Sequence, residues 1–262
     1  MSRDILSRPA PPPDRTTHYG PQPEQVVDLR LPLGDAETLV VLIHGGFWKV
    51  EYDRAHIGPL ADALAQAGYA VAVPEYRRVG SPGGGWPGTF DDISVFCEAL
   101  GMITAAHGIR PRRTVLVGHS AGGHLALWAA GRHRLPIDSR WGTRWQPDAV
   151  VALAACSFLD LADAWGLDDD ATAGLLGGGA EDVPARYALA DPVALLPLGV
   201  QVTLLHGTED QHVPAEMSRE YTARAERAGD NVRLVELPGL EHFALIDPLS
   251  VAWPDLLAAL KS

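Results

Sequence analysis

"TVLVGHSAGGHLALWAA" fills residues 114–130 and joins two different patterns at a single serine. The first part is a short apolar run rich in β-branched residues, and the second is rich in residues that favour a helix. Ser120 stands at the join, with Gly118 and Gly122 two positions to either side. This pattern predicts a buried strand, a tight turn and a helix, with the serine hydroxyl exposed at the turn.

Short apolar runs of the same kind recur along the chain, and helical patterns follow most of them. The predicted strands cover residues 26–31, 39–43, 70–73, 115–117, 150–154, 202–205 and 232–237. Alternating strands and helices favour a mostly parallel sheet. Strands that are apolar at nearly every position favour helices on both faces of that sheet. The predicted fold class is therefore α/β.

The ends of this regular pattern indicate the domain organisation. Residues 1–23 contain six prolines and show no periodicity, which predicts an extended N-terminal arm. Residues 24–262 are predicted to form a single domain. Within it, residues 159–199 mix acidic, glycine and proline positions with short helical signals, which predicts a small cap-like insertion over the active face.

Composition excludes several classes of function. The formal net charge of −12 and the lack of a basic stripe argue against a nucleic-acid partner. No apolar run approaches the length of a membrane span, and the N-terminus has no apolar signal core. Cys97 and Cys156 lie in apolar segments, which is typical of buried free thiols. We therefore expect a cytoplasmic protein without a membrane partner.

A serine becomes a useful nucleophile only beside a base that an acid orients. Asp210 follows the apolar run "VTLLHG", and His242 follows "VRLVELPG". Loops after parallel strands meet at one edge of the sheet, so these residues are expected beside Ser120. Glu209 is an alternative acid, whereas His212 is too close in sequence to Asp210 to serve as the base. The predicted catalytic residues are Ser120, Asp210 and His242.

The stretch "LIHGGFW", residues 42–48, predicts the donors for an oxyanion. Backbone amides near Gly46 and Phe47, together with that of Ala121, are the candidates, and a simple turn is the alternative interpretation. The ten histidines are scattered without an HExxH motif or a Cys/His cluster, so neither a metal nor a cofactor is expected.

Four segments together carry a family resemblance: "HGGFWK" (44–49), "GHSAGGHLA" (118–126), "HGTEDQHVP" (206–214) and "EHF" (241–243). In them the chain resembles serine hydrolases of the α/β-hydrolase superfamily with an HGG oxyanion motif, most of all the arylformamidase (kynurenine formamidase) and small esterase group. The resemblance implies an α/β-hydrolase fold. It also implies that Ser120 is the nucleophile, His242 the general base, and Asp210 the residue that orients the base.

Aromatic residues in the loops are candidates for the walls of a substrate pocket. They are Trp48, Trp86, Phe158, Trp165 and Phe243. Such exposed aromatic loops leave a homodimer interface open as an alternative. Arg77 and Arg78 could meet a substrate carboxylate or pair with local acids such as Asp91 or Asp92.

The expected activity is hydrolysis of a small carboxylic ester or an N-formyl aryl amide through an acyl-serine intermediate. A general carboxylesterase, a lipase-like enzyme, an acyltransferase or a peptidase would use the same residues, because pocket shape selects the substrate. A ligand receptor that kept the fold without turnover is the non-enzymatic alternative.

Overall fold

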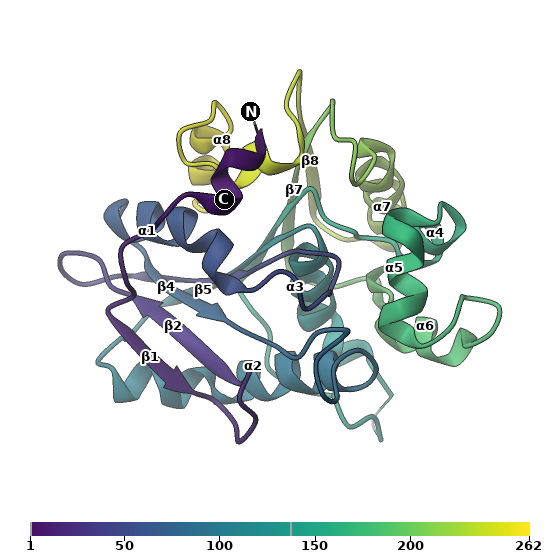
Figure 1. Cartoon of the computed structure of the whole chain (residues 1–262), viewed down its shortest axis with the longest axis horizontal. Coiled ribbons are helices and arrows are strands. Elements are labelled where there is room, and N and C mark those ends of the chain that lie inside the picture. Colours follow the sequence, from purple (N-terminus) through teal and green to yellow (C-terminus); the bar gives the residue numbers. More distant parts are fainter. Residues whose placement is uncertain (1, 137) are drawn as a thin grey trace.

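The chain folds around one eight-stranded β-sheet, seen here in a computed structural model that describes residues 2–136 and 138–262 (Figure 1). The strands are β1 (Arg15–His18), β2 (Val26–Arg30), β3 (Thr38–Ile43), β4 (Ala70–Pro74), β5 (Arg113–His119), β6 (Ala149–Leu153), β7 (Gln201–Gly207) and β8 (Val232–Leu237). Their spatial order is β1-β2-β4-β3-β5-β6-β7-β8. Strands β3 to β8 are parallel, and β1 and β2 pair antiparallel at one edge.

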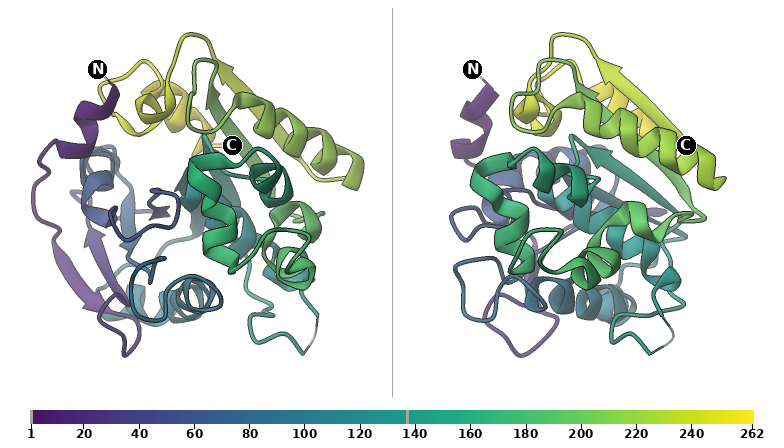
Figure 2. Two further views of the ribbon diagram at one scale, coloured as in Figure 1. Left: turned by 45° about the vertical axis from the view of Figure 1, so that its right-hand side comes forward. Right: turned by 90° about the vertical axis from the view of Figure 1, so that its right-hand side faces the viewer.

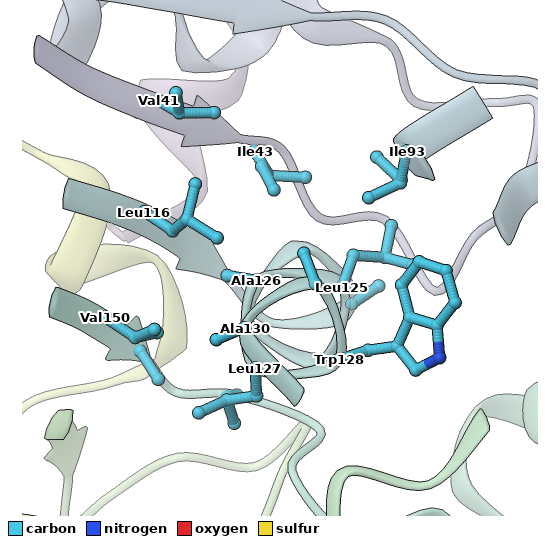
Figure 3. Close-up of a cluster of buried hydrophobic side chains, with 14 of the residues drawn as sticks. Val41, Ile43, Ile93, Leu116, Leu125, Ala126, Leu127, Trp128, Ala130 and Val150 are labelled. Carbon is cyan, nitrogen blue, oxygen red and sulfur yellow. The ribbon is translucent and has the colours of Figure 1, made fainter. Parts of the chain in front are cut away.

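Helices cover both faces of the sheet. One face packs against α1 (Gly58–Gln66) and α8 (Trp253–Ala259), and the other packs against α2 (Gly88–Ala106), α3 (Ala121–Gly131) and α7 (Ala215–Ala228). Alternate residues of a strand point to opposite faces. Val41 and Ile43 of β3 accordingly point toward α3, where Leu125 and Ala126 meet them (Figure 3). This arrangement confirms the predicted α/β fold class.

The helix α3 is buried along its whole length. Each of its eleven residues is buried, and most of them are alanine, glycine or leucine. Small side chains let this helix approach the sheet closely, with Ala126 and Ala130 facing Leu116 and Val150 (Figure 3). Because α3 begins directly after Ser120, its packing fixes the position of that serine.

The segment 159–199 forms short helices beside the sheet edge (Figures 1 and 2). It contains α4 (Leu159–Ala164), α5 (Leu167–Leu176), α6 (Pro184–Ala190) and the 3₁₀ helix η4 (Pro192–Leu195). The remaining 3₁₀ helices are η1 (Ser2–Ser7), η2 (Arg54–Ile57), η3 (Arg132–Arg134) and η5 (His242–Ile246).

The N-terminal segment has more structure than the extended arm that its composition predicts. It contains η1 and the strand β1, which pairs with β2 in the register Thr16 to Asp28. The sequence of β1, "RTTH", is short and polar because the strand is largely exposed at the sheet edge, so it carries no apolar pattern. The other seven strands coincide with the predicted runs to within two residues at each end.

The carboxyl ends of the parallel strands lie together along one side of the sheet, the side where the strands end. Ile43 at the end of β3 pairs with Gly118, two residues before Ser120, and Gly207 at the end of β7 pairs with Leu237 at the end of β8. The loops that follow these strands therefore emerge side by side.

Candidate active site

Ser120 occupies a strained turn between β5 and α3. Its φ of 55° and ψ of −119° are unusual for a residue with a side chain. Its backbone N–H donates to the carbonyl of Leu153 at 2.8 Å, which ties the turn to β6. A Cβ on Gly122 would overlap the carbonyl of Ile43, so only glycine fits there. The fully buried Ala121 starts the helix directly behind the serine.

His242 meets Asp210 where the loops after β7 and β8 come together. Its Nδ1 donates to Oδ2 of Asp210 at 2.6 Å. The two side chains are 3% and 0% exposed. The imidazole ring also lies 4.5 Å from the ring of His119 and 5.1 Å from that of Phe243, measured between centroids. The bond to the carboxylate keeps the proton on Nδ1, which leaves Nε2 as a proton acceptor.

Asp210 is held by its own loop as well as by the histidine. Its Oδ1 accepts from the backbone N–H groups of His212 at 2.8 Å and Val213 at 2.9 Å. Nε2 of His206 lies 3.3 Å from Oδ2. Burial acts to raise the pKa of Asp210, but hydrogen bonds from His206 and His242 outweigh it and hold the pKa well below its ordinary value. The carboxyl group is therefore ionised at neutral pH.

The loop after β3 places its backbone beside the serine. Gly46, Phe47 and Trp48 all have positive φ, at 105°, 46° and 57°, which turns the chain sharply after the strand. A Cβ on Gly45 would lie 3.0 Å from Cβ of Ser120, so the loop and the nucleophile turn are in close contact. This proximity is what an oxyanion site requires.

A buried network anchors this loop from below. Nε2 of His44 donates to Oε1 of Glu75 at 2.9 Å, and the hydroxyl of Tyr76 donates to the carbonyl of His44 at 2.9 Å. Glu75 also accepts from the backbone N–H of Arg54 at 3.0 Å. Burial acts to raise the pKa of Glu75, but His44 and Arg78 outweigh it and lower the pKa to about 2.

A cavity of about 260 Å³ lies beside the carboxyl ends of the parallel strands, and both Ser120 and His242 line it. Phe243 contributes an apolar wall, and Lys49 comes from the loop after β3. Asp168 comes from the segment 159–199, so this segment reaches the cavity. Nζ of Lys49 lies 2.7 Å from Oδ2 of Asp168, and this ion pair joins the segment 159–199 to the loop after β3.

Only one of the five aromatic residues predicted to form the pocket walls lines the cavity that the described residues form. Phe243 lines the cavity, but the other four aromatic residues lie elsewhere among the described residues. Trp48 is fully buried below the loop and donates to Nδ1 of His124. Trp86 packs against Phe90 of α2, Phe158 lies against the guanidinium of Arg224, and Trp165 is exposed at the end of α4. Their positions in loops did not determine which way the side chains point.

Arg77 and Arg78 both have local carboxylate partners. Arg77 pairs with Asp92 at 2.7 Å, which confirms the interpretation as a structural ion pair. Nε of Arg78 lies 3.3 Å from Glu75, and its guanidinium also donates to the carbonyl of Tyr52. Neither arginine lines the cavity with Ser120.

Several cavity residues carried no functional signal in the sequence. Arg3 and Leu6 come from η1, inside the segment expected to be an extended arm. Tyr52 and His56 come from the segment before α1. The apolar pair of Ile5 and Leu6 within a polar stretch is the signal that could have predicted a docked segment here.

Between residues 2 and 262, leaving out residue 137, no group of three or more His, Cys, Asp or Glu side chains is arranged to hold a metal ion. In the same residues, no helix is both long and apolar enough to cross a membrane.

Comparison with known proteins gives a family and named relatives. The profile of the family BD-FAE matches residues 27–224. The probable isoprenylcysteine alpha-carbonyl methylesterase ICME of Oryza sativa subsp. japonica is 28% identical over 254 residues, covering 90% of this chain and 59% of that protein. Esterase LipQ of Mycobacterium tuberculosis (strain ATCC 25618 / H37Rv) is 26% identical over 216 residues, covering 80% and 51%. The chain thus spans little more than half the length of these relatives.

Solved structures resemble the chain over nearly its whole length. A truncated form of a carbohydrate esterase from gut microbiota matches with a TM-score of 0.81 at 20% identity, covering 97% of this chain and 98% of that chain. Esterase B from Lactobacillus rhamnosis (HN001) matches with a TM-score of 0.79 at 18% identity, covering 99% and 89%. At these identities the likeness concerns the fold, which is the α/β-hydrolase fold.

Proposed function

Because this chain belongs to the BD-FAE family, we propose that it is a serine hydrolase that cleaves a small carboxylic ester through an acyl-serine intermediate. The observation that carries the proposal is the 2.6 Å hydrogen bond between His242 and Asp210 at a cavity that Ser120 also lines. Nucleophile, acid and base also follow one another along the chain, as Ser120, Asp210 and His242, in the order typical of α/β-hydrolases.

The reaction would proceed in two halves. Nε2 of His242 takes the proton of the Ser120 hydroxyl while the oxygen attacks the ester carbonyl, and then gives that proton to the departing alcohol. A water molecule then enters, and its oxygen attacks the acyl carbonyl while His242 takes its proton. His242 gives this proton to the Ser120 oxygen as the bond between that oxygen and the acyl carbon breaks, and the acid product leaves. Asp210 stays ionised throughout and stabilises the cationic imidazole, which agrees with its lowered pKa.

Backbone amides would stabilise the oxyanion that forms in each half. The amide of Ala121 follows the nucleophile directly, and those of Gly46 and Phe47 lie on the strained loop beside it. The network of His44, Glu75 and Tyr76 would hold this loop rigid, so that the donors need no rearrangement during the reaction.

The size of the cavity favours a small substrate. Its volume of about 260 Å³ is below the range of about 300–1,000 Å³ that is typical of sites for drug-sized ligands. The names of the relatives, a methylesterase and an esterase, favour an ester over an N-formyl aryl amide. The formamide therefore enters the test as the competing substrate.

The test measures steady-state hydrolysis of short-chain p-nitrophenyl esters beside N-formyl-L-kynurenine. We expect ester hydrolysis by the unmodified protein, and in Ser120→Ala we expect kcat to fall by on the order of 10⁶-fold. Ser94→Ala is the matched control, because Ser94 is a buried serine of α2 outside the cavity. Circular dichroism checks that all three proteins are folded.

Each result has a distinct meaning. Ester hydrolysis that disappears only in Ser120→Ala supports the proposal. A strong preference for the formamide would instead assign an arylformamidase. Hydrolysis that persists in Ser120→Ala would exclude the covalent mechanism. If the unmodified protein hydrolyses neither the esters nor the formamide, a ligand receptor is favoured.

A further inference from the structure

The N-terminal helix η1 is docked firmly beside the loop that carries His242 (Figures 1 and 2). Ile5 is 1% exposed and belongs to the same buried cluster as Leu245 and Ile246 of η5. At the end of the segment, Arg8 donates to both carboxylate oxygens of Asp247, at 2.6 and 2.8 Å. A buried anchor and a bidentate ion pair fix the segment against the body of the protein.

This docking places Arg3 on the wall of the cavity. Arg3 and Leu6 line the same cavity as Ser120 and His242. The guanidinium carbon of Arg3 lies 5.8 Å from the centroid of the Phe243 ring, which is the residue next to the base. The aromatic face attracts the cation and helps to keep it at the cavity.

The contacts of Arg3 leave its charge without an opposite charge beside it. Its guanidinium donates to Nε2 of His212 at 3.4 Å, and this imidazole is neutral at neutral pH. Burial, then His242 and Arg3 itself, lower the pKa of His212. The other cation of the wall, Lys49, is already paired with Asp168. Within residues 2–136 and 138–262, no carboxylate oxygen lies within 4 Å of Arg3.

On the basis of the proposed ester hydrolysis, we propose that Arg3 is a specificity-determining residue that binds an oxyanion on the substrate, at the end away from the scissile ester. A guanidinium offers paired N–H donors that match the two oxygens of a carboxylate. Glu51 also lines the cavity and would favour a cationic substrate, so a cation is the competing choice.

Three methyl esters of similar length test this assignment: monomethyl glutarate, dimethyl glutarate and methyl 4-(trimethylammonio)butyrate. They differ in the charge of the remote end, which is negative, neutral and positive. Methanol release at neutral pH gives kcat and KM for each ester. The variants are Arg3→Met, which removes the charge, Arg3→Lys, which keeps it, and Arg3→Glu, which reverses it. Arg112→Met is the control. Arg112 is exposed and lies at the amino end of β5, whereas the cavity lies beside the carboxyl ends of the strands.

We expect the ratio of kcat/KM for monomethyl glutarate to that for dimethyl glutarate to fall about tenfold in Arg3→Met, mainly through KM. Arg3→Lys should recover part of this ratio, Arg3→Glu should shift preference to the cationic ester, and Arg112→Met should match the unmodified protein.

An unchanged ratio in Arg3→Met, or an equal loss on both glutarate esters, would overturn the inference, because Arg3 would then have no role in charge selection. A preference of the unmodified protein for the cationic ester would overturn it in favour of Glu51. If the unmodified protein hydrolyses none of the three methyl esters and no p-nitrophenyl ester, the proposed function itself is refuted.

Discussion

At the scale of single residues, Asp210 shows how one side chain serves structure and chemistry with different atoms. Oδ1 accepts two backbone N–H groups of its own loop, and Oδ2 faces the imidazoles of His206 and His242. An amide can reproduce the first task, because its oxygen also accepts. It cannot reproduce the second, because its NH₂ group donates where His242 also donates.

Asp210→Asn is therefore expected to keep the loop and lose the catalytic histidine tautomer. We predict a fall in kcat on the order of 10⁴-fold, by analogy with the same change in serine proteases that use a Ser-His-Asp triad. Thermal unfolding should show a much smaller effect. Glu209→Gln is the control, since Glu209 is the exposed neighbouring acid. A comparable loss in both variants, or activity retained in Asp210→Asn, would contradict the assigned role.

At the scale of elements, the turn between β5 and α3 depends on its neighbours in the sheet. The strained Ser120 is possible because α3 is buried on all sides and because β3 lies against the turn. Gly122 touches the backbone of Ile43 and His44, so a side chain there would push two elements apart. The motif around the serine thus reflects contact between strands as much as the turn itself.

Gly122→Ala is predicted to destabilise the protein by about 2–3 kcal/mol or more, because the added methyl group would overlap backbone that cannot move aside. Its ester hydrolysis should fall with it. Gly101→Ala is the matched control, since Gly101 is exposed in α2 with nothing near its missing Cβ. That change should stabilise the protein by about 0.5–1 kcal/mol. Urea unfolding measures the change in unfolding free energy of each variant. Equal changes in Gly122→Ala and Gly101→Ala would rule out the steric argument.

At the scale of the whole molecule, a series of polar and charged side chains connects β2, near the antiparallel edge of the sheet, to the loop beside Ser120. Arg54 bonds to Asp28 on β2 at 2.7 Å, and its backbone N–H donates to Glu75 after β4. Glu75 in turn holds His44 after β3. Three segments that are distant in the sequence are thereby tied together through one buried carboxylate.

This network should make stability depend on pH in a defined window. The pKa of Glu75 falls from 4.5 to about 2 on folding, so its contribution is complete above about pH 4.5 and is lost as the pH falls toward 2. In that window, Glu75→Gln should reduce the slope of unfolding free energy against pH by up to about one proton, or about 1.4 kcal/mol per pH unit. Urea titrations from pH 5 to 2.5 measure both slopes. Identical slopes would show that Glu75 takes no part in acid unfolding.

The sequence predicted those parts of the structure that local pattern determines. The apolar runs located seven strands, and the loops after β3, β5, β7 and β8 were expected at one edge, where the structure places them. Side-chain direction was not predictable in the same way. Trp48 points into the core because His124, far along the chain, accepts its hydrogen bond. Arg3 reaches the cavity only because Ile5 and Arg8 find partners after His242.

The ion pair between Arg8 and Asp247 spans 239 positions of the chain. A nascent chain leaving the ribosome therefore exposes η1 long before its docking partner, which follows all eight strands of the sheet. Closing so long a loop costs chain entropy, which the packing of the intervening sheet and helices offsets. The cavity is completed only after the segment with His242 and Asp247 has been made, so a chain that stops before it lacks both Arg3 in its place and the histidine beside it.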